Sequence, residues 1–213
     1  MKLRELFENV QTISSHELLE MSKLTQGSVR LNNDGKLICA SNFNMNTSRA
    51  TDLFLEVSHG VTKLKYKFET VIGEFNVGSH ELTTFENFPT IVKHNIDAWG
   101  NQFKNFDGLD ISIDGLFDLQ QNDKLTSFKG IDKHIRKCKQ IIVPGGLKSH
   151  LIGVLKIEGL KKIATSYDEV SPKQIPELTL AIEIVNKYLE SGRNINKCMS
   201  ELEDSGLDDY AQL

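Results

Sequence analysis

Two pairs of side chains near the middle of the chain have the types and the spacing that could do chemistry. His59 and His80 are 21 residues apart, and so are Asp97 and Asp118. Two imidazoles could bind a metal ion, and two carboxylates could act as general acid and general base. Neither set is complete, because the next position in the histidine series is Asn101 and no nucleophile accompanies the two aspartates.

We therefore expect both pairs to be structural. The histidines are expected to replace inward-turned asparagines of a repeating unit, and the aspartates to form a solvated acidic strip on a concave sheet. Adjacent strands lie about 4.8 Å apart, which is closer than most hydrolytic carboxylate pairs. Gly145–Ser149 is similar to a phosphate loop but lacks the preceding glycine. The sequence thus predicts no catalytic residue, no metal site, no cofactor and hence no enzyme.

The common spacing belongs to a repeat in the centre of the chain. The pattern apolar-x-apolar-x-x-Asn/His-x-apolar begins at Phe75, at Ile96 and, with one extra residue, at Phe117. Two apolar residues separated by one position lie on the same face of a short strand, and an asparagine amide can satisfy backbone groups where the chain bends. One such unit is too small to bury a core, so units of this kind stack on one another.

The second half of the unit recurs as well, in Leu82–Phe88, Phe103–Leu109 and Leu125–Ile131. These units resemble short leucine-rich repeats. Residues 125–130, 147–160 and 198–210 are similar to degenerate repeat proteins of tailed bacteriophages. The resemblance covers roughly residues 50–213. It implies a phage origin and an α+β fold, an irregular leucine-rich-repeat-like solenoid of short strands with helical caps. Most such phage proteins have no assigned activity, so it implies no reaction.

We expect three regions along the chain. Residues 1–26 are an N-terminal helical cap or docking element, residues 27–167 a strand-rich repeat solenoid, and residues 168–213 a C-terminal helical cap. The caps are expected because the first and last units of a solenoid would otherwise expose their core faces.

Local signals give the expected elements. An apolar stripe from Leu3 to Ile13 predicts one helix, and Ser14 is an N-cap for a second helix. Asn33-Asp34-Gly35 predicts a hairpin turn, and residues 42–51 read as a loop. Near the end, helices are expected over residues 177–191, closed by Gly192, and over residues 194–204.

Composition excludes several classes of protein. The 213 residues carry a formal net charge of −4, which argues against general affinity for nucleic acid. The three cysteines, Cys39, Cys138 and Cys198, are far apart, so we expect a reduced chain without a disulfide framework. The N-terminal residues lack the apolar core of a signal peptide, and no apolar run is long enough to span a bilayer. We therefore expect the host cytoplasm or a virion as its location.

The only tryptophan gives the best candidate for a binding surface. In its repeat unit Ile96 and Ala98 take the core positions, so Trp99 should point outward together with Asp97. A slip of register at Ala98, which is smaller than its counterparts in the neighbouring units, would instead place the indole inside. The expected partner-binding residues are Asn76, Asp97, Trp99, Asp118 and Gln120.

The leading hypothesis is a non-enzymatic bacteriophage accessory protein that binds a protein partner through this strand face. Acidic and aromatic groups there favour a partner with a basic surface. A virion structural protein docked through its N-terminal helix is the alternative, and a small phage hydrolase or anti-defence enzyme is the third class. The sequence leaves the oligomeric state open.

Overall fold

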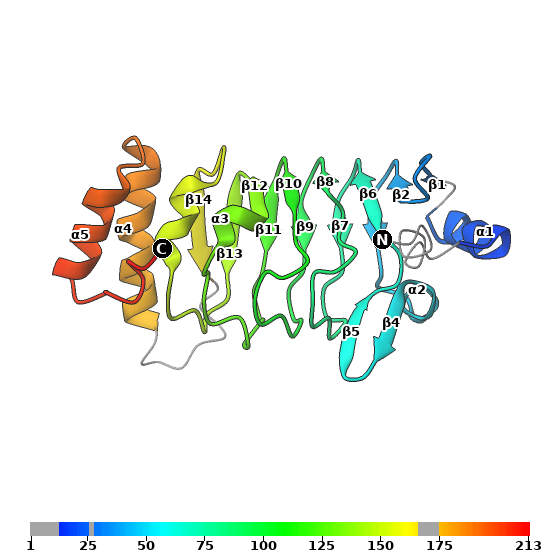
Figure 1. Cartoon of the computed structure of the whole chain (residues 1–213), viewed down its shortest axis with the longest axis horizontal. Helices are drawn as coiled ribbons and strands as arrows, with labels where there is room; N and C mark the ends of the chain where they lie inside the picture. Colours follow the sequence, from blue (N-terminus) through cyan, green and yellow to red (C-terminus); the bar gives the residue numbers. More distant parts are fainter. Residues whose placement is uncertain (1–12, 26–27, 166–174) are drawn as a thin grey trace, which may run out of the picture.

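The computed structural model describes residues 13–25, 28–165 and 175–213 and shows an elongated α+β molecule (Figure 1). Most of its strands belong to two open sheets, and neither sheet closes into a barrel. The helices are α1 (Ser15–Leu24), α2 (Ser48–Phe54), α3 (Ile131–His134), the 3-10 helix η2 (Leu151–Lys156), α4 (Ile175–Glu190) and α5 (Ile195–Asp204). The strands are β1 (Val29–Leu31), β2 (Leu37–Cys39), β3 (Phe43–Asn44), β4 (Leu55–Ser58), β5 (Val61–Leu64), β6 (Phe68–Val71), β7 (Phe75–Asn76), β8 (Ile91–Val92), β9 (Ile96–Asp97), β10 (Ile111–Ile113), β11 (Leu116–Asp118), β12 (Ile135–Lys137), β13 (Gln140–Val143) and β14 (Lys162–Thr165).

The chain passes alternately through the two sheets. Sheet A has the order β1-β2-β6-β8-β10-β12, and sheet B has the order β14-β13-β11-β9-β7-β3. Apart from the β1–β2 pair, all strand pairs in these two sheets are parallel. We call a stretch with one strand of sheet A, the next strand of sheet B and the return to sheet A a coil.

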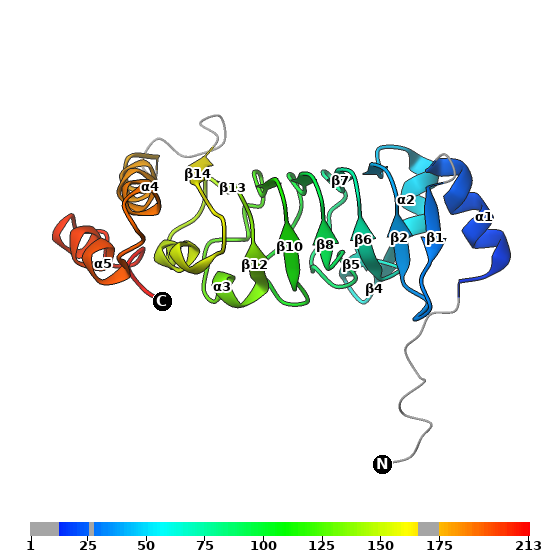
Figure 2. The same cartoon turned by 90° about the horizontal axis from the view of Figure 1, so that it is seen from above.

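The presence of two sheets corrects the expectation of a single concave one. The repeat pattern identified β7, β9 and β11 of sheet B, and the hairpin signal identified β1 and β2 of sheet A. It did not identify the other strands of sheet A, such as β8 and β10, which come from the end of each return segment. Because strands with the same spacing line two sides of the molecule, the coils follow one another in a nearly straight row (Figure 1). Seen from above, the strands of sheet A lie side by side along this row (Figure 2).

Pairing in sheet B follows the sequence period. Phe75 pairs with Ile96, and Ile96 pairs with Phe117. All three side chains are completely buried, as the apolar-x-apolar pattern requires. The return segments add further aromatic side chains to the same core, and the rings of Phe85 and Phe103 stack with their centroids 3.8 Å apart. Each buried phenylalanine contributes about 1.5–3 kcal/mol of transfer free energy.

Tight corners join sheet A to sheet B. A Cβ atom on Gly115 would lie 2.4 Å from Oδ1 of Asn95 and 2.7 Å from the carbonyl oxygen of His94 in the preceding coil. That Oδ1 accepts a hydrogen bond of 3.0 Å from the backbone N–H of Leu116. The same arrangement recurs where Gly73 lies against Asn42. The asparagine amide therefore occupies the space that a side chain on the next coil would need.

We predict that Gly115→Ala lowers the free energy of unfolding by roughly 1–3 kcal/mol, because the new methyl group overlaps backbone atoms that cannot move independently. Denaturant unfolding followed by circular dichroism measures the change. Gly146→Ala is the matched control, since its Cβ would meet only the carbonyl oxygen of Asp123 at 3.7 Å. Equal stability of the two variants would contradict this account of the corner.

The dipeptide Ser-His occurs twice with the 21-residue spacing, at residues 58–59 and 79–80, and its first copy does not adopt the repeat conformation. Residues 55–64 form an antiparallel hairpin, β4–β5, and its tip is His59-Gly60 with φ angles of 51° and 77°. Two successive positive φ angles are typical of a tight hairpin turn and favour glycine. His59 is therefore exposed, and the expectation that it turns inward beside His80 is wrong.

The segment 42–51, which reads as a loop in the sequence, contains the short strand β3 and the start of α2. Phe43 pairs with Phe75, and the hydroxyl of Thr47 accepts a hydrogen bond from the backbone N–H of Ala50 as the N-cap of α2. The sequence does not reveal this strand, because β3 has only two residues and its one apolar side chain stands among polar neighbours. The predicted hairpin turn at Asn33-Asp34-Gly35 is confirmed, with Gly35 at a φ of 72°.

At the N-terminal end, α1 begins with the predicted cap at Ser14. Its hydroxyl accepts a hydrogen bond from the N–H of Glu17, whose carboxylate bonds back to the N–H of Ser14. The same carboxylate accepts hydrogen bonds from the hydroxyl of Tyr66 and the ammonium group of Lys65. These contacts, the Tyr66 hydroxyl first, lower the pKa of Glu17 to about 2. The earlier helix expected over residues 3–13 lies almost entirely outside the described residues.

We predict that Glu17 makes the stability of the protein depend on pH in the acid range. Its folded pKa lies below its ordinary value, so its contribution is fully present above pH 4.5 and is lost as the pH falls toward 2. Glu17→Gln should be less stable than wild type at pH 7 and should lose less stability on acidification. Thermal unfolding at a series of pH values measures this, and parallel curves for the two proteins would contradict it.

The C-terminal end is closed by α4 and α5, which follow the predicted ranges closely (Figure 2). The amide of Asn186 on α4 donates to the carbonyl oxygen of Ile163 and accepts from its N–H, both at 2.9 Å. This side chain thus satisfies backbone groups of β14, the last strand of sheet B. The guanidinium group of Arg193 donates to the carbonyl oxygens of Leu155, Ile157 and Leu160.

Candidate functional site

The side chain of Trp99 lies at the surface. Ile96 and Ala98 are completely buried, and 37% of Trp99 is exposed. The register is therefore the outward one expected from the repeat, although Trp99 lies in the turn after β9 and not in the strand itself.

The indole lies over the preceding coil at Gly78. A Cβ atom on Gly78 would be only 2.5 Å from Nε1 of Trp99 and 3.1 Å from Oδ1 of Asp97. Gly78 thus leaves open the space into which the indole edge and the carboxylate both reach. Any side chain at this position would displace the tryptophan, so the placement of the indole depends on the glycine at position 78.

Asp97 and its counterparts in three other coils close the turns that end the sheet B strands. The side-chain oxygens of Asn44, Asn76, Asp97 and Asp118 each accept a hydrogen bond from the N–H two residues later, at 2.8–3.4 Å. Strand pairing sets these four residues side by side. The expected acidic strip is therefore half-buried and partly occupied with backbone contacts, not simply solvated. Such Asx turns are a common use of short polar side chains at bends.

We call Asn76, Asp97, Trp99, Asp118 and Gln120, together with Glu74 and Gly78, the Trp99 surface. The amide Nδ2 of Asn76 donates to Oδ2 of Asp97 at 3.0 Å, and Nε2 of Gln120 donates to Oδ2 of Asp118 at 3.2 Å. The five sequence-predicted residues thus lie together along three neighbouring strands. Glu74 and Gly78 were not among the predicted binding residues, although Gly78 stands one 21-residue period before Trp99.

Burial raises the pKa of Asp97 above its ordinary value, and the negative charge of Glu74 acts in the same direction. Hydrogen bonds from the backbone and the side chain of Trp99 act against this rise. The carboxylate therefore carries an electrostatic cost that a nearby positive charge would relieve.

A buried asparagine holds the turn that carries Trp99. Asn101 is completely buried, and its Nδ2 donates to the carbonyl oxygens of Val77, Ala98 and Trp99 at 2.9–3.3 Å. Its Oδ1 accepts from the backbone N–H groups of His80 and Leu82 at 3.2 and 2.9 Å. The amide therefore links two coils and orients the tryptophan turn, which agrees with the inward asparagine expected from the repeat.

Asn122 repeats the donor half of this role one coil later, with Nδ2 donating to three carbonyl oxygens. Its Oδ1 is buried without a hydrogen-bond partner among the described residues, so it does not repeat the acceptor half. His80 stands at the same repeat position, and its Nε2 is likewise buried without such a partner. Burial lowers the pKa of His80, so its imidazole packs as a neutral group.

We predict that Asn101→Ala lowers the free energy of unfolding by about 2–4 kcal/mol, because several buried backbone groups lose their partner at once. Asn105→Ala is a matched control, since Asn105 is exposed and bonds only to nearby Asp107. Chemical denaturation of both variants measures the difference. A loss at Asn101 no larger than that at Asn105 would contradict the proposed link between coils.

Other chemically interesting groups do not form a reactive cluster in the part of the chain that the structure describes. There, no group of three or more His, Cys, Asp or Glu side chains is arranged to hold a metal ion. The three cysteines are free and buried, and burial raises the pKa of Cys138 and of Cys198 to about 12. The thiols of Cys138 and Cys198 are thus protonated and poorly reactive.

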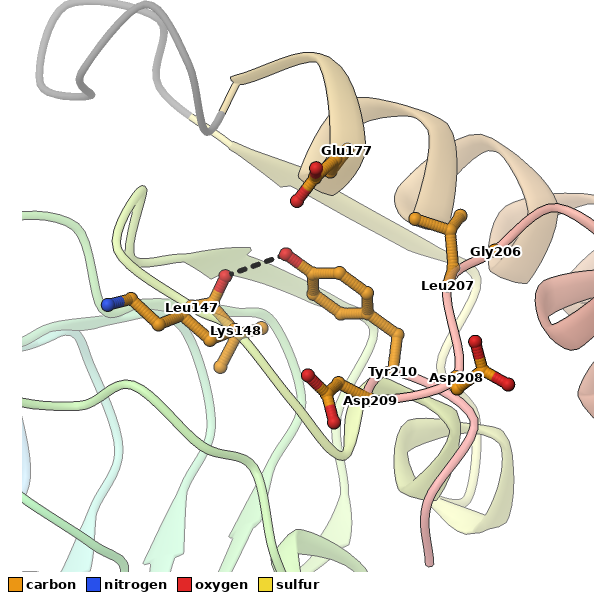
Figure 3. A pocket seen from close by; sticks show the side chains of 8 residues that line it. All are labelled: Leu147, Lys148, Glu177, Gly206, Leu207, Asp208, Asp209 and Tyr210. Carbon is orange, nitrogen blue, oxygen red and sulfur yellow. Dashed lines mark hydrogen bonds between the residues drawn. The ribbon is translucent and has the colours of Figure 1, made fainter.

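A pocket of about 360 Å³ lies where the C-terminal segment meets the last coils (Figure 3). Tyr210 points into it, but its hydroxyl donates to the carbonyl oxygen of Leu147 at 3.0 Å, and burial raises its pKa to about 12. Three of the other residues that line it are acidic, Glu177, Asp208 and Asp209, and one is basic, Lys148. The Tyr210 hydroxyl therefore holds the C-terminal segment against Leu147.

No protein-family model matches this chain, and neither a curated protein nor a solved structure is significantly similar to it. Within the described residues, no helix has the length and apolar character needed to cross a membrane. Inference about function therefore depends on the geometry of the chain itself.

Proposed function

We propose that this protein is a non-enzymatic accessory protein of a tailed bacteriophage that binds a protein partner through the Trp99 surface. The observation that carries the proposal is the single tryptophan, which is 37% exposed at the end of a sheet strand although its neighbours Ile96 and Ala98 are fully buried. Exposed tryptophans are frequent anchors of protein interfaces. The phage origin is supported by the resemblance of residues 50–213 to phage repeat proteins.

The proposal includes the repeat solenoid. Support comes from the sheet B pairs Phe75–Ile96 and Ile96–Phe117, and from side-chain contacts between residues 21 positions apart, such as Asn76 with Asp97. In such a stack each coil fixes the side chains of the next. Asn76, Asp97 and Asp118 are already held by hydrogen bonds, so little side-chain entropy is lost when a partner binds.

The test is affinity capture from lysate of phage-infected bacteria with tagged wild type, Trp99→Ala and Leu180→Ala. Leu180 on α4 is the matched control, because it is a similarly exposed apolar side chain, 42% exposed, away from the Trp99 surface. We expect a stoichiometric protein that wild type and Leu180→Ala retain and Trp99→Ala loses. Calorimetry with the purified partner should show at least about a 30-fold loss of affinity, as for an anchor worth 2 kcal/mol or more.

Trp99→Ala should keep the wild-type fold, with a loss of unfolding free energy below about 1 kcal/mol, because the side chain lies outside the core. Capture of phage head or tail proteins regardless of Trp99 would overturn the proposal in favour of a virion component docked through another surface. Unfolding of the variant would instead show that the indole is a structural group.

A further inference from the structure

Charged residues are arranged differently along the two sheets. Along sheet A, carboxylates are paired with cations of neighbouring coils. These pairs are Lys36–Glu69 at 3.0 Å, Arg136–Asp110 at 2.7 Å, Lys137–Asp114 at 2.8 Å and Lys93–Asp114 at 3.4 Å. Along sheet A, these acids thus each lie within ion-pair distance of a lysine or arginine from a neighbouring coil.

The Trp99 surface on sheet B lacks this arrangement. Among the described residues, no lysine or arginine lies within ion-pair distance of Glu74 or Asp97. In the described part of the chain, the donors to these carboxylates are neutral. Asn95 donates to Glu74 at 3.1 Å, and the Asn76 amide and the Trp99 backbone N–H donate to Asp97 at 3.0 and 3.4 Å. Each carboxylate oxygen can accept more than one hydrogen bond, so capacity remains for a cationic donor.

The tryptophan lies beside these charges. Nε1 of its indole and Oδ1 of Asp97 both reach the space above Gly78. They lie 2.5 and 3.1 Å from the position that a Cβ atom on Gly78 would occupy. A partly exposed indole ring beside a half-buried carboxylate is a combination that suits a flat cation. The cation can stack on the ring while its edge donates hydrogen bonds to the acid.

Resting on the proposed function, we infer that the protein partner inserts an arginine side chain at the Trp99 surface. Its guanidinium group stacks on the indole of Trp99 and donates hydrogen bonds to Asp97, with Glu74 adding a second negative charge. Arginine fits better than lysine, because its planar group stacks on aromatic rings and carries several donors in one plane. An ammonium group is a point charge that keeps more of its hydration.

The unique tryptophan makes this testable without knowing the partner. Its indole N–H gives one NMR signal from the whole chain, so a titration reports on this surface alone. The probe is the blocked peptide Gly-Arg-Gly-Arg-Gly, and the matched peptides replace both arginines with lysine or with uncharged citrulline. We expect a saturable shift with the arginine peptide, at least about fivefold weaker binding with lysine and none with citrulline.

Two variants locate the site. Asp97→Asn preserves the shape and the turn-closing oxygen of Asp97 but removes its charge, and it should weaken the arginine peptide at least about fivefold. Asp107→Asn removes an exposed charge from a return segment and should leave the affinity unchanged. Equal responses to all three peptides, no shift at all, or insensitivity to Asp97→Asn would overturn the inference.

The two proposals fail in different ways. If capture finds a Trp99-dependent partner while the arginine peptide causes no shift, the docking surface stands and its arginine preference is wrong. If the peptide binds as expected but no Trp99-dependent protein is captured, the arginine site stands and the proposed protein-binding function is wrong.

Discussion

The structure depends on hydrogen bonds that side-chain amides make between neighbouring coils. Its sheet strands are only two to four residues long, so strand pairing alone leaves the bends between them without partners. Asparagines supply the missing donors and acceptors at several bends. Asn101 does so for the turn of Trp99, and Asn95 does so for the corner at Leu116. The candidate surface exists because these amides fix the backbone beneath it, so its geometry is a property of the stack and not of one loop.

This dependence explains which parts of the fold could be predicted. Positions such as Phe75 and Ile96 could be assigned from the sequence because their burial follows directly from the apolar pattern. Beyond its first hairpin, sheet A could not be predicted, since a strand such as Ile91-Val92 is only one short apolar pair near the end of a return segment and has no polar marker. The hairpin tip at His59-Gly60 was misassigned for a related reason. The dipeptide Ser-His occurs both in a repeat position, at 79–80, and in a tight turn, at 58–59. The residue directly after it differs, and the glycine at position 60 favours the turn.

The candidate surface shows the same division. The period identified Asp97, Asp118 and Trp99 as outward neighbours, because strand alternation alone determines the side on which a residue lies. It could not show that Gly78 leaves room for the indole, which depends on contact between coils. That no lysine or arginine of the described residues pairs with Glu74 or Asp97 was equally hidden, since lysines are frequent in the sequence and only the packing shows which of them pair with acids along sheet A.

The amide of Asn186 has a consequence for the size of the molecule. A strand at the end of a row has backbone N–H and C=O groups on its outer side that no further strand pairs with, and a second chain could continue the row there. At β14 a side chain from α4 takes both hydrogen bonds of Ile163 that an incoming strand would use. The side-chain amide of Asn186 has the geometry of a peptide group but does not continue into a further strand, so it ends the hydrogen bonding of sheet B at β14. It helps keep the protein a discrete particle instead of the first segment of a fibre.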